Sequence, residues 1–314
     1  MSDNAALVTR LQGILMLRRN EPLAKHTSFR IGGPADLYAQ ARSREQLLAA
    51  VQAAWETGTP TLLLGGGSNL LVLDGGVRGV VIETRARSVT GLPAAPLPPG
   101  EVVEIVAEAG APLAALARRT AALGLAGLEW AVDLPGTVGG AVVNNAGAHG
   151  GEMAGVLVAA ELLEPEGTVS WWPTAALGLA YRTSRLKVAP LGQPRPVVLA
   201  AKIRLQAADP LSLRAALTRY SQYRRATQPV GACAGSMFKN PPDQAAGWYI
   251  EQAGMKGAQV GAVQVSEIHG NFMLNLGGAR ATDVLRLVER VQEAVWRRFG
   301  VSLELEIQVV GEAT

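Results

Sequence analysis

Two glycine-rich segments contain the residues of this chain best suited to holding a ligand. The first, Gly65-Gly66-Gly67-Ser68-Asn69-Leu70, follows an apolar run at 61–64 that predicts a buried strand. Glycines let backbone N–H groups come close to an anion, so the loop is a candidate nest for a nucleotide phosphate. It is not a dinucleotide-binding GxGxxG motif, because Leu70 stands where the last glycine is needed, and it lacks the Lys and Ser/Thr that end a P-loop. The same glycines also fit a structural turn.

The second segment runs from Gly127 to Gly151 and carries almost no charge after Asp133. It is too long for a single tight turn. Backbone donors and acceptors beside Val and Ala side chains suit the edge and the faces of a flat, uncharged ring such as an isoalloxazine. The alternative is an irregular loop packed in the core. The candidate cofactor contacts in this segment are Pro135, Gly136, Thr137, Gly139, Gly140, Asn145 and Gly147.

The elements that position these segments are expected to mix α and β structure. Ser43 with Gln46 three residues later forms a capping box for a helix that ends at Gly58. Thr282 is expected to cap the last helix, which stops at Gly300 and is followed by a closing strand at 303–307. The spacing of Val284, Val288, Val291, Val295 and Phe299 predicts that this helix buries them on one face. The other expected elements are strands at 77–82, 102–109, 155–163 and 197–205, a helix between Pro112 and Gly124, and a helix from about Asp209 to Gln228.

Composition indicates a globular protein and excludes several classes of function. Hydrophobic residues make up 48% of the 314 residues and charged residues 18%, and the net charge is only +3, which does not suggest a nucleic-acid binder. Cys233 is the only cysteine, so no intramolecular disulfide or CxxC site can form, and the three histidines show no metal-ligand spacing. Residues 1–20 lack the features of a signal peptide, and no apolar run reaches 18 residues, so a cytoplasmic protein without a membrane span is expected.

Several motifs together resemble the UDP-N-acetylenolpyruvoylglucosamine reductase family, commonly called MurB. They occur in the family's order between residues 27 and 311, which is more specific than any single motif. Asp133 and Gly270 depart from the family's pattern, and we give Asp133 no role. The matching segments are 27–35 (TSFRIGGPA), 64–70, 127–130 (GLEW), 134–151, 181–184 (YRTS), 234–241 (AGSMFKNP), 269–272 (HGNF) and 303–306 (LELE).

The resemblance implies an α+β fold, with a two-lobed FAD-binding region of the vanillyl-alcohol oxidase type and a smaller α+β substrate-binding domain. The expected boundaries are 1–83 and 84–207 for the lobes and 208–314 for the substrate-binding domain, with the C-terminal strand returning to the active site. The segment between Tyr181 and Arg224 is short, which implies the second type of the family, without the extra tyrosine loop. The implied activity is NADPH-dependent reduction of the enolpyruvyl UDP-sugar through noncovalent FAD, in peptidoglycan precursor synthesis.

Three residues are expected to carry the chemistry that the resemblance implies. Hydride addition to the enolpyruvyl double bond builds negative charge on the adjoining carboxylate, which Arg182 can hold by a bidentate contact. Ser236 is expected to protonate the neighbouring carbon. Glu306 would donate a hydrogen bond through a raised pKa, or orient Arg182 or a water. Considered without the resemblance, each also fits an ordinary surface or turn residue.

The remaining site residues are expected to hold the UDP-sugar substrate. The candidates are Tyr181, Arg224, Lys239 and Asn240, with Arg225 beside them. Expected partners are the UDP-sugar and NADPH, with no metal, nucleic acid, membrane or obligate protein partner. One rival is a flavin oxidase of the same fold that acts on an alcohol or a sugar lactone and would not need Ser236 and Glu306. The other is a noncatalytic FAD-binding module, which would lose the third-domain residues.

Overall fold

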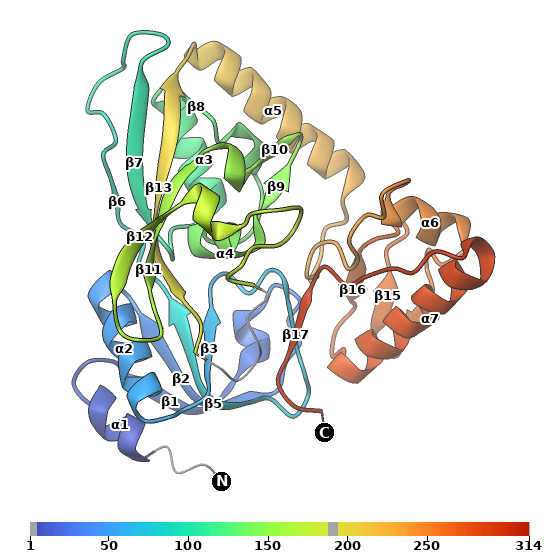
Figure 1. Cartoon of the computed structure of the whole chain (residues 1–314). Coiled ribbons are helices and arrows are strands. Elements are labelled where there is room, and N and C mark those ends of the chain that lie inside the picture. The colour runs from blue at the N-terminus through green and yellow to red at the C-terminus, as the bar shows by residue number, and fades with distance from the viewer. Residues whose placement is uncertain (1–4, 188–193, 314) are drawn as a thin grey trace. The chain divides into compact units, whose positions relative to one another are not determined.

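The computed structural model describes residues 5–187 and 194–313, which form two compact units (Figure 1). The first unit comprises residues 1–17, 39–66 and 80–224, and the second comprises 18–38, 67–79 and 225–314. Strands β2 (Pro34–Ala41) and β5 (Val77–Thr84) begin in the second unit and end in the first. Both are members of the sheet with order β1-β2-β5-β3, in which β1 is Leu17–Pro22 and β3 is Thr61–Leu64. Each unit is described below by itself.

An antiparallel sheet organises the first unit, with strand order β12-β11-β13-β7-β6 and β8 paired to β13. Its largely buried strand β11 contacts the long β13, and Ile105, Leu162 and Ile203 are fully buried in the core. The elements of this unit, the strands of that sheet included, are α1 (Ala5–Leu11), α2 (Arg44–Glu56), β3 (Thr61–Leu64), β6 (Val89–Thr90), β7 (Val102–Glu108), α3 (Leu113–Ala122), β8 (Leu125–Ala126), η2 (Glu129–Ala131), α4 (Val138–Asn144), β9 (Gly147–Ala148), β10 (Gly151–Glu152), η3 (Met153–Gly155), β11 (Leu157–Leu163), β12 (Val169–Pro173), η4 (Thr174–Leu177), β13 (Val197–Ala207) and most of α5 (Pro210–Thr227).

Local sequence explains how helix α2 begins and ends. The Ser43 side chain accepts a hydrogen bond from Gln46 N at 3.2 Å, and the Gln46 side chain reaches back to accept one from Arg42 N at 2.8 Å. The first bond uses an N–H group that the first turn of the helix leaves without a partner, and the second ties the residue before the N-cap to the same turn. The helix ends before Gly58, whose φ is +62°. The capping-box prediction for this helix is confirmed.

The second unit contains a small antiparallel sheet of order β14-β15-β16 and the long helix α7. Val284, Val288, Val291 and Val295 of α7 are buried against this sheet and against helix α6, as the spacing predicts. Strand β17 pairs in parallel with β4, Gln308 opposite Leu70. The bounds in this unit are β1 (Leu17–Pro22), η1 (Leu23–His26), β4 (Leu70–Val72), α6 (Ala246–Gln252), β14 (Gln259–Val260), β15 (Val263–Val265), β16 (Met273–Asn275), α7 (Ala281–Phe299) and β17 (Gln308–Val310).

The start of α7 and the last strand differ from the sequence-based expectation. Helix α7 begins at Ala281, so Thr282 lies in its first turn, and Asp74 caps the helix from far away in the sequence. The Asp74 carboxylate accepts bonds from Ala281 N (2.9 Å), Thr282 N (3.1 Å) and Thr282 Oγ1 (2.8 Å). Burial opposes ionisation of Asp74, yet these bonds lower its pKa overall. The expected strand at 303–307 is reduced to one bridge at Leu305, and the ladder comes later, in β17.

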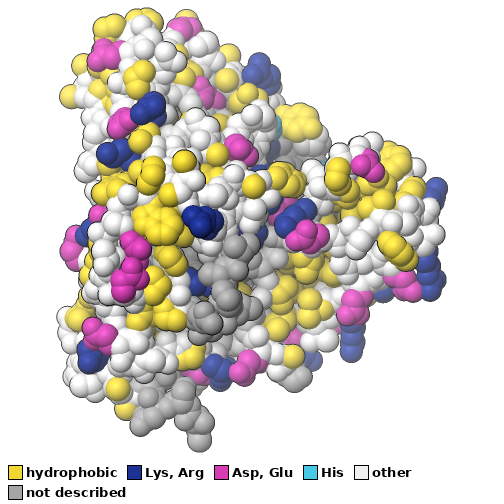
Figure 2. Space-filling model, viewed as in Figure 1, with side chains coloured by type: hydrophobic (Ala, Val, Ile, Leu, Met, Phe, Trp, Pro, Cys, Tyr) yellow, Lys and Arg dark blue, Asp and Glu magenta, His cyan; other side chains and the backbone are white. Residues whose placement is uncertain are grey.

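The surface carries charges of both signs. In the face shown in Figure 2, Lys and Arg side chains are interspersed with Asp and Glu and with hydrophobic groups. Within residues 5–187 and 194–313, no helix combines the length and the hydropathy that a membrane crossing needs. The same residues contain no cluster of three or more His, Cys, Asp or Glu that could hold a metal ion.

Candidate functional site

In the first unit, the two glycine-rich segments meet backbone to backbone. A Cβ on Gly65 would lie 2.6 Å from Thr137 Oγ1, and a Cβ on Gly66 would lie 2.9 Å from Gly136 Cα. Real Cβ atoms do not approach other atoms this closely, so this contact requires glycine. Two segments that were predicted separately to bind one cofactor therefore lie side by side.

The second segment contains a short helix, α4, that the sequence did not predict, because glycine and valine are poor helix formers. Thr137 caps this helix by accepting a bond from Gly140 N at 3.4 Å. A Cβ on Gly139 would lie 2.8 Å from Ala109 Cβ, so packing explains that glycine. Gly140 is exposed, and the nearest atom to its Cβ position would be Thr137 Oγ1, at 3.7 Å. No described neighbour requires a glycine there, although glycine weakens a helix.

Arg182 lies in a tight turn that is tied to this same segment. Ala180 and Thr183 exchange two backbone hydrogen bonds, and Arg182 has φ +56°. Arg182 Nη2 donates to Gly147 O at 2.8 Å, and its guanidinium carbon lies 5.1 Å from the centre of the Tyr181 ring. The turn is held further by Ser184 Oγ donating to Val143 O and by Asn145 Nδ2 donating to Ala180 O.

Asn145 is buried with φ +43°, and its Oδ1 also accepts a bond from Ala154 N at 3.0 Å. Both ends of its amide are thus bonded within the protein. The first unit therefore places Arg182 next to the predicted flavin segment, and Asn145 joins the two.

Four buried polar atoms support a ligand site in this unit. Among the described residues, Thr84 Oγ1, Arg85 Nε, Asn144 Oδ1 and His149 Nε2 have no hydrogen-bond partner, and all four belong to the first unit. Buried polar atoms normally have a partner, so unpaired ones point to a ligand or to water. Their unmet hydrogen-bonding capacity, and the exposed Gly140, are compatible with a polar cofactor such as FAD in this unit.

Helix α5 brings Arg224 to the end of the same segment. His149 stacks on Tyr220 with ring centres 4.4 Å apart. Burial, and then the positive charge of Arg224, lower the pKa of His149. Asp133, at the start of the segment, accepts a bond from Ser221 Oγ at 2.5 Å and pairs with Arg118. These contacts anchor α5, so Asp133 has a structural role that the sequence did not suggest.

In the second unit, the rest of the first glycine-rich loop lies against the turn that contains Ser236. A Cβ on Gly67 would lie 2.1 Å from His26 O, and one on Gly235 would lie 4.0 Å from Ser68 O. Asn69 Nδ2 donates to Glu306 O at 3.3 Å, and Asn69 O accepts from Gln308 N. Residues 67–70, Ser236 and Glu306 are thus neighbours within one unit.

Ser236 and Glu306 lie on segments that are hydrogen-bonded to each other. Glu306 N donates to Met237 O at 2.9 Å, and Phe238 bridges to Leu305. Both Ser236 and Glu306 are partly buried. The backbone segments that carry Ser236 and Glu306 are therefore adjacent.

The residues expected to hold the UDP-sugar differ in how far other contacts engage them. Lys239 pairs with Glu304 at 2.5 Å, and the Glu304 side chain is 74% exposed, so this ion pair adds little to stability. Asn240 Oδ1 accepts a bond from Ala246 N at 3.0 Å, just at the start of α6. Tyr181 is 48% exposed, and Arg225 is exposed too. Lys239 and Asn240 lie in the second unit, whereas Tyr181 and Arg224 lie in the first.

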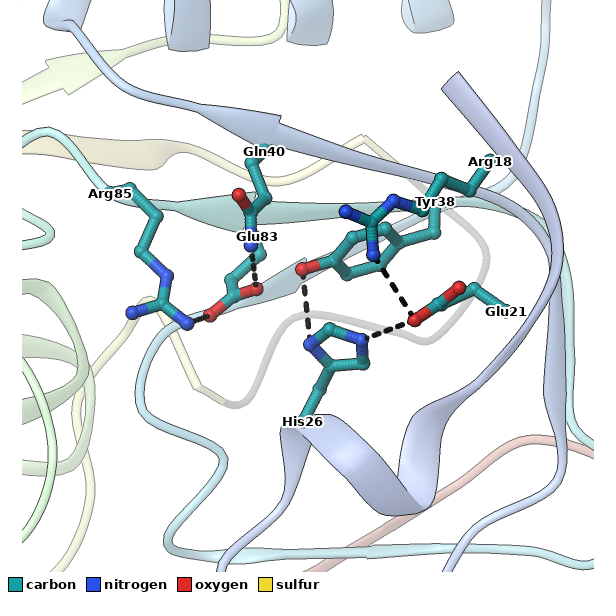
Figure 3. A network of polar contacts seen from close by, with 7 residues as sticks. All are labelled: Arg18, Glu21, His26, Tyr38, Gln40, Glu83 and Arg85. Atoms are coloured by element: carbon teal, nitrogen blue, oxygen red, sulfur yellow. Dashed lines mark hydrogen bonds and ion pairs between the residues drawn. The ribbon is translucent and has the colours of Figure 1, made fainter. Parts of the chain in front are cut away.

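The 27–35 segment, for which the sequence suggested no role, supports Gly67. Ser28 N donates to Gly67 O at 3.0 Å, and Ser28 Oγ donates to Cys233 O at 2.6 Å. The preceding His26 lies 3.0 Å from both Tyr38 Oη and Glu21 Oε1, as Figure 3 shows. The hydrogen bond from His26, above all, lowers the pKa of Glu21.

Figure 3 also shows a polar cluster of the first unit, where buried Glu83 binds Gln40 and Arg85. Arg85 is one of the residues with an unpaired buried nitrogen. Sequence reasoning missed both clusters, because their members are scattered and individually unremarkable in type.

Comparison with known proteins identifies the family. The family model for the UDP-N-acetylenolpyruvoylglucosamine reductase C-terminal domain matches residues 227–310, and that for an FAD binding domain matches residues 35–172. A UDP-N-acetylenolpyruvoylglucosamine reductase of Chloroflexus aggregans is 45% identical over 94% of this chain and 98% of the relative. The one from Rubrobacter xylanophilus is 47% identical over 93% of this chain and 95% of the relative.

This chain belongs to the UDP-N-acetylenolpyruvoylglucosamine reductase (MurB) family. A crystal structure of the reductase from Thermus caldophilus agrees, with a TM-score of 0.77 and 35% identity over 95% of this chain and 99% of that one. The fold prediction, an α+β chain with a vanillyl-alcohol oxidase-type FAD-binding region and a smaller C-terminal domain, is confirmed. The chain is an FAD-dependent oxidoreductase of peptidoglycan precursor synthesis that uses NADPH to reduce an enolpyruvyl UDP-sugar.

Proposed function

We propose that Arg182, Ser236 and Glu306 are the catalytic residues of this reductase. The observation that carries the proposal is the backbone bond from Glu306 N to Met237 O, which sets Glu306 beside the Ser236 turn and next to Asn69. A flavin oxidase acting on an alcohol or a lactone has no use for this pair, because it delivers no proton to a carbon.

When bound and reduced by NADPH, FAD would supply the hydride for the enolpyruvyl double bond. The electron pair of that bond then builds up on the other carbon and on the attached carboxylate. Arg182 holds the carboxylate, because a guanidinium offers two parallel donors and a permanent positive charge. Its Tyr181 neighbour and the bond to Gly147 O keep the guanidinium oriented before substrate arrives.

Ser236 donates the proton that completes the reduction. A hydroxyl is a weak acid, but the carbanion beside a carboxylate is a much stronger base, so the transfer from Oγ to carbon is downhill. Glu306 donates a hydrogen bond to the developing charge when protonated, or orients Arg182 or a water when ionised. The Ser236 alkoxide regains its proton from solvent, so one hydride and one proton are added overall.

We assign the cofactor and substrate contacts as follows. The proposed FAD contacts are Gly65, Gly66, Gly67, Ser68, Asn69, Leu70, Pro135, Gly136, Thr137, Gly139, Gly140, Asn145 and Gly147. The close approach of Gly65 and Gly66 to Thr137 and Gly136 within the first unit supports these four, and residues 67–70, in the second unit, are proposed from the sequence motif. The UDP-sugar contacts are Tyr181, Arg224, Lys239 and Asn240.

We also propose that the chain is of the second type of the family. β13 and α5 account for residues 197–207 and 210–227, which leaves only 182–196 for an inserted loop, and 188–193 of these lie outside the described residues. A cytoplasmic location is likewise proposed, and the free thiol of Cys233 is compatible with a reducing compartment. The lobe boundaries at 83 and 207 remain predictions.

An anaerobic spectrum tests this function. Adding NADPH to the purified holoprotein should bleach the flavin absorption, and adding the enolpyruvyl UDP-sugar should then restore it with formation of the lactyl product. Reoxidation by an alcohol-derived carbonyl or by oxygen alone, with no response to the enolpyruvyl UDP-sugar, would favour an oxidase. A protein that NADPH cannot bleach would favour a noncatalytic module.

A further inference from the structure

Asn271 makes an unusual pair of contacts with the segment that carries Ser236. Its Nδ2 donates to Phe238 O at 2.8 Å, and its Oδ1 accepts from Phe238 N at 2.9 Å. The side chain therefore pairs with both peptide groups of one residue, as a neighbouring β-strand would. Asn271 is only 3% exposed, so both bonds are shielded from water.

The backbone on both sides of this contact continues the pairing. Met237 N donates to Asn271 O at 2.9 Å, and Ser236 bridges to Phe272. On the opposite edge, Met237 O accepts from Glu306 N. Residues 236–239 are thus clamped between 271–272 and 304–306, and the Asn271 side chain provides two of the clamping bonds.

The position of Asn271 is itself fixed by a tight turn. Asn271 N donates to His269 Nδ1 at 3.1 Å, and Phe272 N donates to His269 O at 3.0 Å. The turn is anchored by Ser266, which is 1% exposed and whose Oγ accepts from Ile268 N and His269 N. The backbone of Asn271 is thus held in place, so its side chain can restrain the peptide groups of Phe238.

A primary amide completes this arrangement at any pH. The Phe238 N–H and C=O are buried and each needs a partner, and the amide offers a donor and an acceptor side by side without having to gain or lose a proton. Loss of either bond would free the segment at a point two residues from Ser236. Proton transfer to carbon depends steeply on geometry, because a misplacement of about 1 Å can cost about 100-fold in rate.

We propose that Asn271 is a positioning residue that holds Ser236 in place for proton delivery. The proposal rests on the proposed function, because it takes Ser236 as the acid. Asn271 acts through the peptide groups of Phe238 and need not touch the substrate or the cofactor.

The test uses Asn271→Asp in the full-length holoenzyme, with the two half-reactions measured separately by anaerobic stopped-flow. When ionised, the aspartate keeps the acceptor for Phe238 N but loses the donor to Phe238 O, whereas a protonated carboxyl keeps both bonds. The half-reactions are therefore measured at several pH values from neutral upward, and the defect should grow as the carboxyl ionises. We expect flavin reduction by NADPH to stay within about threefold of the wild type, and reoxidation by the enolpyruvyl UDP-sugar to slow by about 10- to 100-fold. The solvent deuterium isotope effect on reoxidation should rise, because the proton step becomes more limiting.

A double substitution separates positioning of Ser236 from a general structural role. In the Ser236→Ala background the acid is already gone, so Asn271→Asp should slow reoxidation by no more than about threefold further. If the full factor persists in that background, Asn271 acts through another group or through the fold, and the proposal is wrong. If Ser236→Ala alone reoxidises normally, the acid itself is misassigned, which overturns the proposed role of Ser236 and this proposal with it.

Asn275→Asp is the matched control, because Asn275 lies in the same unit and its Nδ2 donates to Phe29 O at 3.0 Å and to Arg30 O at 3.3 Å. The same chemical change there should lower the thermal unfolding midpoint but leave reoxidation within about threefold of the wild type. Equal slowing by both variants would show that loosening this unit is sufficient, and would refute the proposal. Should Asn271→Asp fail to retain FAD, Asn271→Ser, which keeps a hydroxyl for one of the two bonds, is measured in the same way and judged by the same outcomes.

Discussion

Gly140 offers a test in which protein stability and cofactor affinity should change in opposite directions. It lies in the first turn of α4, and its Cβ position is clear of every described atom out to Thr137 Oγ1, at 3.7 Å. With room for the methyl group, Gly140→Ala should stabilise the FAD-free protein by up to about 0.5–1 kcal/mol, because glycine loses more backbone entropy on folding than alanine does. The thermal or denaturant unfolding of the FAD-free protein measures this gain.

The same methyl group should weaken FAD binding if the cofactor lies against this glycine. Forcing one extra carbon into a filled contact costs about 1–3 kcal/mol. This corresponds to a dissociation constant raised by about 5- to 150-fold, measured by FAD titration of the deflavinated protein. Two other glycine substitutions serve as controls, one for FAD affinity and one for protein stability. Gly155→Ala, also clear of neighbours, should leave FAD affinity unchanged, and Gly139→Ala should destabilise the protein, because its Cβ would lie 2.8 Å from that of Ala109.

A Gly140→Ala protein that is more stable and binds FAD as tightly as the wild type would place the cofactor elsewhere. Gly66 is a poorer position for this test. A side chain there would collide with Gly136 before it could reach any ligand, so weaker FAD binding would have two explanations.

Three further outcomes are expected. Arg182→Lys loses the planar fork, so flavin reoxidation should slow more than flavin reduction in the two half-reactions, and equal losses would assign Arg182 to the flavin site or the fold. Asp74→Ala removes three hydrogen bonds at the start of α7 and should cost about 1–2 kcal/mol of unfolding free energy in urea. Because the folded pKa of Asp74 is lowered, this contribution is complete above the unfolded pKa and should fade as pH falls through the folded one, and a pH-independent difference would contradict it. Burial, and then Lys256, lower the pKa of His269, so the unfolded chain takes up more protons as pH falls below about 6.5 and stability should drop there. His269→Gln should flatten that drop in unfolding experiments at several pH values, and an unchanged slope would assign it to other groups such as His149.

The sequence predicted those parts of the fold that short-range physics determines. The Ser43 cap, the glycine stop of α7 at Gly300 and the buried valines of that helix all depend on residues within a few positions of one another. The cap of α7 does not. Asp74 is more than 200 residues away in the sequence from Ala281 and Thr282, and no local sequence pattern predicts such a contact.

The candidate site shows the same division. Both glycine-rich segments could be recognised because glycine itself is the signal. Helix α4 was missed, because Gly139 and Gly140 disfavour a helix, and tertiary contacts to Ala109 outweigh that preference. The roles of Asn145 and Asn271 were missed because each acts by pairing with a distant peptide group, at Ala180 and Phe238. An asparagine in a turn looks the same in sequence whether it bonds to solvent or to such a partner.

Ser236→Ala, followed through the oxidative half-reaction in a single turnover, tests the central claim most directly. The substitution removes one hydroxyl and keeps the backbone bonds around it. The variant should bind FAD and accept electrons from NADPH at a near-normal rate, and then reoxidise with the enolpyruvyl UDP-sugar about 10²- to 10⁴-fold more slowly, the usual contribution of general acid catalysis. Reoxidation within a few-fold of the wild type, with unchanged stereochemistry of deuterium incorporation from heavy water, would contradict the claim that Ser236 delivers the proton.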